Sequence, residues 1–188
     1  MVTQQPPQLN IGVLMMTNSP NLRGLVLITI VLLVAIVAIL AICLTPRPLL
    51  IWNASKSVPI GWYFVENRQP KLHEIAVVKL EDWPELYASA RGYLPLNVWL
   101  LKPVAGLSPD IVCRFGRYVF VDGKLVARAK MFDRRHRMLP RWKGCHILTP
   151  DEVFLIARPK NSFDGRYFGP VERSQVLGVA HRLRFNVE

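Results

Sequence analysis

The sequence predicts a mainly β domain that is preceded by one N-terminal transmembrane helix. Residues 24–44 contain no charged side chain, and short runs of β-branched and aromatic residues recur from about Pro46 onward. Two of these runs are separated by the turn-forming pair Asp122-Gly123. We therefore divide the chain into a flexible tail (1–23), a transmembrane anchor (24–45) and a folded domain (46–188). The folded domain has roughly 140 residues, enough to bury a hydrophobic core.

The uncharged segment has the length of a membrane span. It contains 21 residues, Gly24–Leu44, and a helix needs about 20 to cross a hydrocarbon core of about 30 Å. A cleaved signal peptide is less favoured, because its apolar core is normally about 7–15 residues long. A lipoprotein-type site at Cys43 would need a small residue in place of Ile42. A buried helix of a soluble protein is a third alternative, although nothing else in the chain could wrap it.

The elements expected in the folded domain follow from composition and turn residues. Asp122-Gly123 supplies the positive φ angles of a type I′ turn, so residues 118–121 and 124–127 should form a β-hairpin. Asp82–Ala90 is the one short helix that the pattern favours, with Asp82 as its N-cap. Further strands are expected at 62–65, 75–78, 153–157 and 176–185.

Composition restricts the partners and cofactors. The chain has 24 Lys and Arg residues against 13 Asp and Glu residues, a formal net charge of +11. So basic a balance indicates an anionic partner, either nucleic acid or a bilayer surface, without choosing between them. The three cysteines form no C-x-x-C pair and no cluster with histidine at zinc spacing, so we expect neither a metal site nor a cofactor.

A serine turn follows the anchor directly. The segment Asn53–Tyr63 carries Ser57, and Pro59 and Gly61 are expected to fix a turn at the start of a strand. A serine in such a turn can present its hydroxyl on a rigid backbone. An ordinary polar loop is the alternative, and this segment alone does not exclude it.

A single lysine, Lys102, interrupts an apolar run in the segment from Trp99 to Asp110. Lysine is rarely buried without a reason, although an isolated one usually extends its amine to the surface. A desolvated Lys102 would have a lowered pKa and could act as a base near neutral pH. Further along, Asp164 and Arg166 are two residues apart, so on a strand they would share a face and could pair. A solvated surface pair is the alternative there.

In this order the three segments resemble the S26 signal peptidase family. Its motifs are a Ser-x-Pro turn after an anchor, a Leu-Lys-Pro-Val-x-Gly-x-x-x-Asp box and an Asn-Ser-x-Asp-x-Arg-Tyr-x-Gly box. The resemblance covers residues 53–179 and is strongest to the TraF-type conjugative transfer signal peptidases. Two departures are Ser108-Pro109-Asp110, where general leader peptidases carry Pro-Gly-Asp, and Gly165, where serine is common. The resemblance implies a signal-peptidase/LexA-like β-fold and a serine endopeptidase.

The resemblance also implies the roles of the dyad. Ser57 would be the nucleophile, and neutral Lys102, 45 residues further on, would take its proton during attack on a peptide carbonyl. Lys102 would then return a proton to the leaving amine. The backbone N–H of Ser57 would hold the oxyanion, with the hydroxyl of Ser55 as a second donor.

Supporting residues follow from the same likeness. Ser162 matches the family serine that orients the lysine amine, and Asp164 matches an acidic position that would act through Arg166. No histidine is needed for this chemistry. We therefore expect the four histidines to be structural or surface residues: His73, His136, His146 and His181.

Location and partners are expected from the resemblance as well. It implies a single-pass protein of the bacterial inner membrane, with its peptidase domain in the periplasm and a propilin or preprotein as substrate. Cys113 and Cys145 both fall in this domain, so we expect a disulfide between them, two buried thiols being the alternative. The basic segment Arg128–Lys143 lacks a nucleic-acid recognition fold, so we expect it to contact anionic lipid rather than nucleic acid.

Three functions remain open from the sequence. The leading one is a pilin-maturation peptidase of a conjugative type IV secretion system, a branch in which some members join the new ends into a ring. A general type I signal peptidase is the near alternative. A non-enzymatic anchored assembly factor with a degenerate peptidase fold is the distant one. The sequence leaves the cleavage site, the oligomeric state and the start codon (Met1, Met15 or Met16) undetermined.

Overall fold

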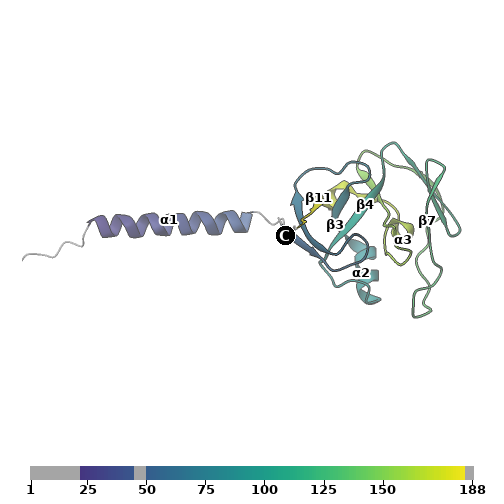
Figure 1. Cartoon of the computed structure of the whole chain (residues 1–188), viewed down its shortest axis with the longest axis horizontal. Helices are drawn as coiled ribbons and strands as arrows, with labels where there is room; N and C mark the ends of the chain where they lie inside the picture. Colours follow the sequence, from purple (N-terminus) through teal and green to yellow (C-terminus); the bar gives the residue numbers. More distant parts are fainter. Residues whose placement is uncertain (1–21, 45–49, 185–188) are drawn as a thin grey trace, which may run out of the picture. The chain divides into compact units, whose positions relative to one another are not determined.

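The computed structural model describes residues 22–44 and 50–184 and divides the chain into two units, Met1–Pro46 and Arg47–Glu188. In the first unit, helix α1 (Leu22–Leu44) forms where the anchor is expected (Figure 1). Its side chains are described for residues 24–40 only. Within the described residues, no helix has the length and apolar composition that crossing a bilayer requires. The anchor stays a prediction, and residues 1–21 of the predicted tail lie outside the described part.

The second unit is built from two antiparallel sheets. The large sheet has the strand order β1-β2-β11-β3-β4-β9-β10, and the small sheet has the order β7-β6-β5-β8. The strands are β1 (Leu50–Asn53), β2 (Gly61–Glu66), β3 (Ile75–Lys79), β4 (Trp99–Leu107), β5 (Ile111–Phe115), β6 (Tyr118–Val121), β7 (Lys124–Arg128), β8 (Gly144–Ile147), β9 (Glu152–Leu155), β10 (Val171–Glu172) and β11 (Val176–Arg182). The helices are α2 (Asp82–Ala90) and α3 (Gly165–Phe168), with a 3₁₀ turn at Arg173–Gln175. The prediction of a mainly β domain is confirmed.

Most predicted elements are present, and one cap is wrong. Strands β6 and β7 form the expected hairpin, and Asp122 and Gly123 have the positive φ angles of 48° and 75° that its turn requires. Helix α2 has the predicted bounds, but its N-cap is Glu81, which lies in extended backbone, and Asp82 is already the first helical residue. Strand β11 ends at Arg182, so the last strand is shorter than expected, and residue 185 lies outside the described part.

Strand β4 lies in the interior of the fold. Strand β4 lies between β3 and β9 inside the large sheet, and Figure 1 shows β11, β3 and β4 side by side. Leu100, Leu101 and Val104 of β4 are buried in two hydrophobic clusters. A third cluster, which includes Val112 of β5 and Phe154 of β9, joins the small sheet to the large one. A polar side chain on β4 is therefore surrounded by apolar neighbours.

Candidate active site

The turn that carries Ser57 is held by a buried asparagine. Asn53, the last residue of β1, donates hydrogen bonds from Nδ2 to the carbonyl oxygens of Ser55 (2.8 Å), Val58 (3.1 Å) and Pro59 (3.1 Å). The phenolic hydroxyl of buried Tyr63 also donates to the carbonyl of Pro59, at 2.7 Å. Because loop carbonyls are fixed from two strands, the backbone around Ser57 is rigid, and the side chain is half-buried.

Lys102 and two serines meet in a triangle. The amine Nζ of Lys102 lies 2.6 Å from Oγ of Ser57 and 2.7 Å from Oγ of Ser162, and the two hydroxyl oxygens lie 3.2 Å apart. Lys102 is only 4% exposed and Ser162 only 6%. The side chain of Lys102 therefore does not reach the surface, although an isolated lysine usually does.

Burial sets the protonation of this amine. Loss of hydration lowers the pKa of Lys102 from 10.5 to about 8, the charge of Asp164 opposes the shift, and the charge of Arg166 adds to it. At pH 7 about one amine in ten is then neutral. A neutral amine 2.6 Å from a serine hydroxyl can accept its proton, the arrangement required of a general base.

Asp164 and Arg166 form a buried ion pair behind the triangle. Arg166 donates from Nε to Oδ1 of Asp164 at 2.7 Å and from Nη2 to Oδ2 at 3.0 Å. Asp164 is 0% exposed and Arg166 is 2% exposed, so the alternative of a solvated surface pair is wrong. The pairing considered from the sequence is present, but the two residues are not on a strand: Asp164 is the N-cap of α3 and accepts a hydrogen bond from the backbone N–H of Arg166.

The pair positions the segment that carries Ser162. Oδ2 of Asp164 accepts a hydrogen bond from the backbone N–H of Ala157 at 3.0 Å, and Arg166 donates to the carbonyl of the same residue. Both ends of the loop between Ala157 and α3 are therefore tied to one ion pair. Ser162 lies within this loop, so the ion pair limits where its hydroxyl can move.

Arg114 is a buried residue that sequence reasoning missed. It lies on β5, is 1% exposed, and donates to the carbonyl oxygens of Gly116 (3.1 Å), Pro140 (3.3 Å) and Arg166. Burial lowers the pKa of Arg114. The sequence offered one signal: Arg114 lies two residues after Val112, which is buried. Residues two apart on a strand share a face, which would point Arg114 inward as well. Arg114 ties the small sheet to α3.

Ser55, the predicted second oxyanion donor, lies in the same turn. Its hydroxyl donates to Oδ1 of Asn53 at 2.9 Å, and its backbone N–H donates to the same oxygen at 3.1 Å. The hydroxyl would have to turn away from Asn53 to reach a substrate oxygen. The oxyanion role of Ser55 and of the Ser57 backbone stays a prediction.

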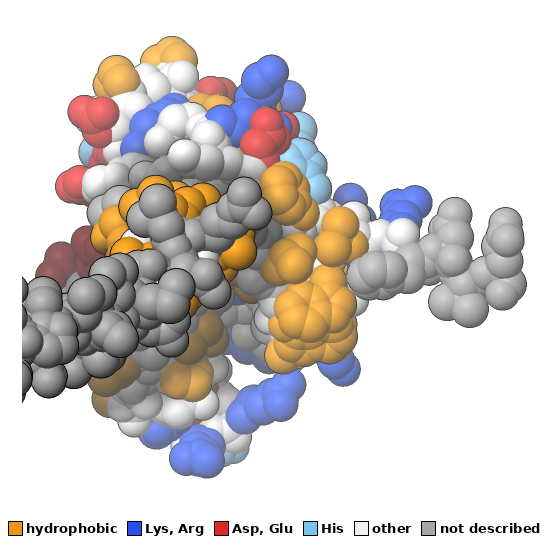
Figure 2. Space-filling model, turned by 90° about the vertical axis from the view of Figure 1, so that its left-hand side faces the viewer, with side chains coloured by type: hydrophobic (Ala, Val, Ile, Leu, Met, Phe, Trp, Pro, Cys, Tyr) orange, Lys and Arg blue, Asp and Glu red, His pale blue; other side chains and the backbone are white. Residues whose placement is uncertain are grey.

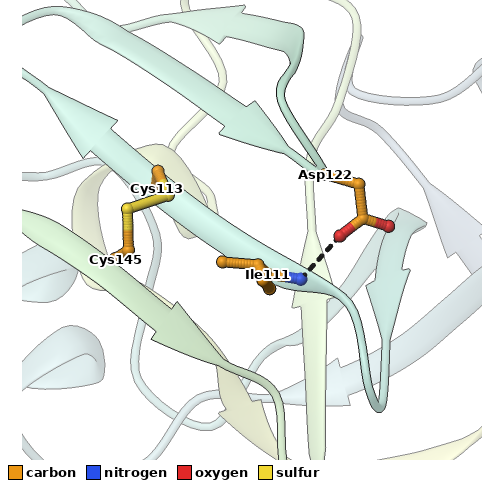
Figure 3. Close-up of a disulfide and its surroundings, with 4 residues drawn as sticks. All are labelled: Ile111, Cys113, Asp122 and Cys145. Carbon is orange, nitrogen blue, oxygen red and sulfur yellow. Dashed lines mark hydrogen bonds between the residues drawn. A yellow bond between two sulfur atoms is a disulfide. The ribbon is translucent and has the colours of Figure 1, made fainter.

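Cys113 and Cys145 form a disulfide between paired strands. They are direct partners in the β5–β8 register, and their sulfur atoms are 2.05 Å apart. Figure 3 shows the bond beside Ile111, whose backbone N–H donates to Oδ1 of Asp122 at 2.8 Å. The disulfide and this hydrogen bond hold the start of β5, the strand that carries Arg114.

A cleft opens beside the triangle. It has a volume of about 480 Å³, and its lining includes Ser57, Lys102 and Ser162. Residues between 91 and 94 and between 130 and 139 also line it. None of the four histidines lines this cleft. Within the described ranges, no group of three His, Cys, Asp or Glu side chains could hold a metal ion.

Comparison with known proteins identifies the family. The sequence model of "Signal peptidase, peptidase S26" matches residues 22–184. A plasmid transfer protein TraF from Escherichia coli is 32% identical over 138 residues, which is 68% of this chain and 78% of the relative. A conjugal transfer protein TraF from Agrobacterium fabrum (strain C58 / ATCC 33970) is 29% identical over 139 residues, with the same coverage. The chain therefore belongs to the signal peptidase S26 family, in its TraF-type branch.

Proposed function

We propose that this chain is a serine endopeptidase with a Ser57–Lys102 dyad that processes a propilin during conjugative transfer. The observation that carries the proposal is the 2.6 Å separation between Oγ of Ser57 and a buried lysine amine. Family membership implies a serine peptidase, and the names of the relatives supply the context of plasmid and conjugal transfer.

The reaction follows from the placement of the two groups. As Oγ of Ser57 attacks the scissile carbonyl, its proton passes to Nζ of Lys102 and a tetrahedral intermediate forms. The C–N bond then breaks, the proton moves from Lys102 to the leaving amine, and an ester remains on Ser57. Water hydrolyses the ester, or an amine of the same pilin chain attacks it and closes a ring. Ser162 contacts both partners and would keep the lone pair of the amine directed at Ser57.

We further propose that the enzyme is anchored in the inner membrane with this domain in the periplasm. The support is the uncharged segment Gly24–Leu44 and an apolar outer face on the β1–β2 pair. Trp52 lies opposite Trp62 in the register, and these side chains are 52% and 44% exposed. Figure 2 shows hydrophobic side chains gathered on one area of the surface. Exposed aromatic side chains of this kind are typical of membrane interfaces.

The experiment is propilin processing in donor cells, read by mass spectrometry of the mature pilin. Cells that carry Ser57→Ala or Lys102→Ala should accumulate uncut propilin, while Ser174→Ala, a change at an exposed serine, should leave processing intact. Mature pilin in cells carrying both changes would favour the anchored assembly factor. Growth rescue of a strain depleted of its leader peptidase would favour the general type I signal peptidase.

A further inference from the structure

The cleft beside Ser57 is strongly basic. Apart from Lys102, its charged lining residues are five basic side chains and one acidic side chain: Arg91, Lys130, Arg134, Arg135, Arg137 and Asp133. Four of the five basic residues come from one segment, residues 130–139. The proposed reaction requires one neutral amine and no further cation, so the mechanism does not account for this charge.

The single acidic residue does not balance these cations. Asp133 is paired with Arg137 at 2.7 Å and also accepts from the hydroxyl of Tyr93 at 2.7 Å. Burial alone would raise the pKa of Asp133, but these hydrogen bonds outweigh it and lower the pKa, so the carboxylate is charged. Lys130 donates to the neutral amide oxygen of Asn161. Four positive charges therefore remain uncompensated in the cleft lining.

Three of the arginines have side-chain N–H groups without a hydrogen-bond partner among the described residues. Nη1 of Arg91 is buried and has no hydrogen-bond partner among the described residues. Its guanidinium lies 4.8 Å from the ring centre of Tyr87, which holds the side chain in place. The side chains of Arg134 and Arg135 are exposed and make no hydrogen bond or ion pair with residues 50–184. A buried donor without a partner costs free energy, so a bound acceptor would stabilise the site.

We propose that this cleft recognises a carboxylate of the peptide substrate close to the bond that Ser57 cleaves. The inference rests on the proposed peptidase function and names the chemistry of its substrate: an acidic side chain near the scissile bond, or the free C-terminal carboxylate of a short leaving segment. Arginine donates to carboxylates in a planar, two-pronged geometry, and a cleft lined by one sign of charge concentrates the opposite sign.

The location favours a peptide over a membrane. Arg134 and Arg135 line the same cleft as Ser57 and Lys102, which a substrate chain must enter. The exposed apolar side chains of the β1–β2 pair are not part of this lining. The basic segment, which the sequence assigns to anionic lipid, thus lies where it can contact a substrate.

The test compares peptides that differ by one charge. Peptides are prepared that span the cleavage site of the propilin processed by this enzyme. They carry Glu or Gln at each position flanking the site, and a free or an amidated C-terminus. We expect one Glu peptide or one free-carboxylate peptide to be cleaved with a kcat/KM about five- to tenfold higher than its neutral partner, the effect of one or two partly exposed ion pairs. The preferred peptide identifies the source of the carboxylate. The preference should shrink as salt is raised, because partly exposed charges are screened.

Matched variants assign the preference to the cleft. Arg134→Gln/Arg135→Gln should remove the preference, so that charged and neutral peptides are cleaved with similar kcat/KM values. The control, Lys71→Gln/Lys124→Gln, removes the same charge from two exposed residues that do not line the cleft, and it should keep the preference. All proteins are assayed as full chains in uncharged detergent and in phosphatidylcholine vesicles with and without anionic lipid.

Peptide binding to the Ser57→Ala variant distinguishes failure of the carboxylate site from failure of the proposed peptidase function. The Glu or free-carboxylate peptide, carrying an uncharged fluorophore, should bind this variant about five- to tenfold more tightly than its neutral partner. Equal binding and equal cleavage of charged and neutral peptides would overturn the carboxylate site and leave the peptidase standing. Preferential binding without any Ser57-dependent cleavage would contradict the proposed function and keep the site. Loss of binding to anionic vesicles in Arg134→Gln/Arg135→Gln, with an unchanged peptide preference, would assign the segment to the membrane and overturn the proposal.

Discussion

The amine of Lys102 lies 2.7 Å from the hydroxyl of Ser162, almost as close as the 2.6 Å that separate it from Ser57. The same hydroxyl lies 3.2 Å from Oγ of Ser57. Ser162 thus contacts both groups of the proposed dyad from a third segment of the chain. We propose that Ser162 fixes the direction of the amine and takes no part in bond making.

Removal of this contact should slow the chemistry more than it weakens binding. We expect Ser162→Ala to lower kcat by about ten- to hundredfold with little change in KM, a smaller effect than loss of a general base, about 10²–10⁴-fold. Ser162→Thr, which keeps the hydroxyl, should recover most of the rate. Steady-state kinetics on a cleaved peptide check the prediction. A rise in KM at constant kcat would assign Ser162 to substrate binding.

The rate should follow the titration of Lys102. Burial lowers the pKa of this amine to about 8, and only the neutral form can accept the proton of Ser57. We therefore expect kcat/KM to rise about tenfold per pH unit below pH 8 and to level off above it. A pH profile of peptide cleavage between pH 6 and 9.5 measures this. A rate that still rises about tenfold per pH unit at pH 9.5 would show that the amine is not desolvated, and a flat profile would show that titration of Lys102 does not control the rate.

The same shift predicts a pH-dependent stability. The unfolded chain binds a proton at Lys102 up to about pH 10.5, whereas the folded chain loses it near pH 8. This residue therefore destabilises the fold by about 3 kcal/mol at neutral pH, and the destabilisation shrinks as pH rises from 8 towards 10.5. Lys102→Met should raise the free energy of unfolding at pH 7, with a smaller gain at pH 9.5. Urea unfolding at both values checks it, and an equal gain at both would contradict the cause.

Breaking the buried ion pair should destabilise the domain strongly. Asp164→Asn leaves the guanidinium of Arg166, which is 2% exposed, without its carboxylate. We expect the free energy of unfolding to fall by about 3–5 kcal/mol. The matched control is Glu74→Gln, which breaks a partly exposed ion pair with Arg68 and should have a far smaller effect. Similar losses in the two variants, measured by urea unfolding, would argue against a structural role for the buried pair.

Gly165 should not tolerate the serine that is common at this position in the family. A Cβ atom at Gly165 would lie 2.8 Å from the backbone oxygen of Leu155 and 2.9 Å from Cε2 of Phe154. Backbone atoms cannot move aside cheaply, so Gly165→Ser should lower the free energy of unfolding by about 1–3 kcal/mol. Thermal unfolding checks this. An unchanged midpoint would show that α3 can shift away from β9.

Local rules predicted the parts of this fold that local chemistry determines. Asp122-Gly123 indicated the hairpin because the turn needs positive φ angles at both residues, and the structure has them. The N-cap of α2 was predicted one residue too late. Asp82 was chosen because Asp is a preferred N-cap residue, but the cap is the preceding residue, Glu81. Turn chemistry of this kind is visible in a few neighbouring residues.

The contacts that assemble the site are long-range, and the sequence alone did not reveal them. Arg114 reaches the carbonyl of Arg166 across 52 positions, and Lys102 reaches Ser162 across 60. The motif likeness named the residues of the triangle, but composition and periodicity gave no reason to bring them together. In the sequence, Arg134 and Arg135 are part of a basic segment without any sign of a binding site. The fold places both in the cleft lining.

The most direct test of the account is a double-mutant cycle on Ser57 and Lys102. If the two residues form one nucleophile–base unit, Ser57→Ala and Lys102→Ala should each reduce kcat/KM for a propilin peptide to nearly the same residual value, and the double variant should fall no further. Losses that multiply in the double variant, or one single variant that keeps substantial activity, would contradict the dyad.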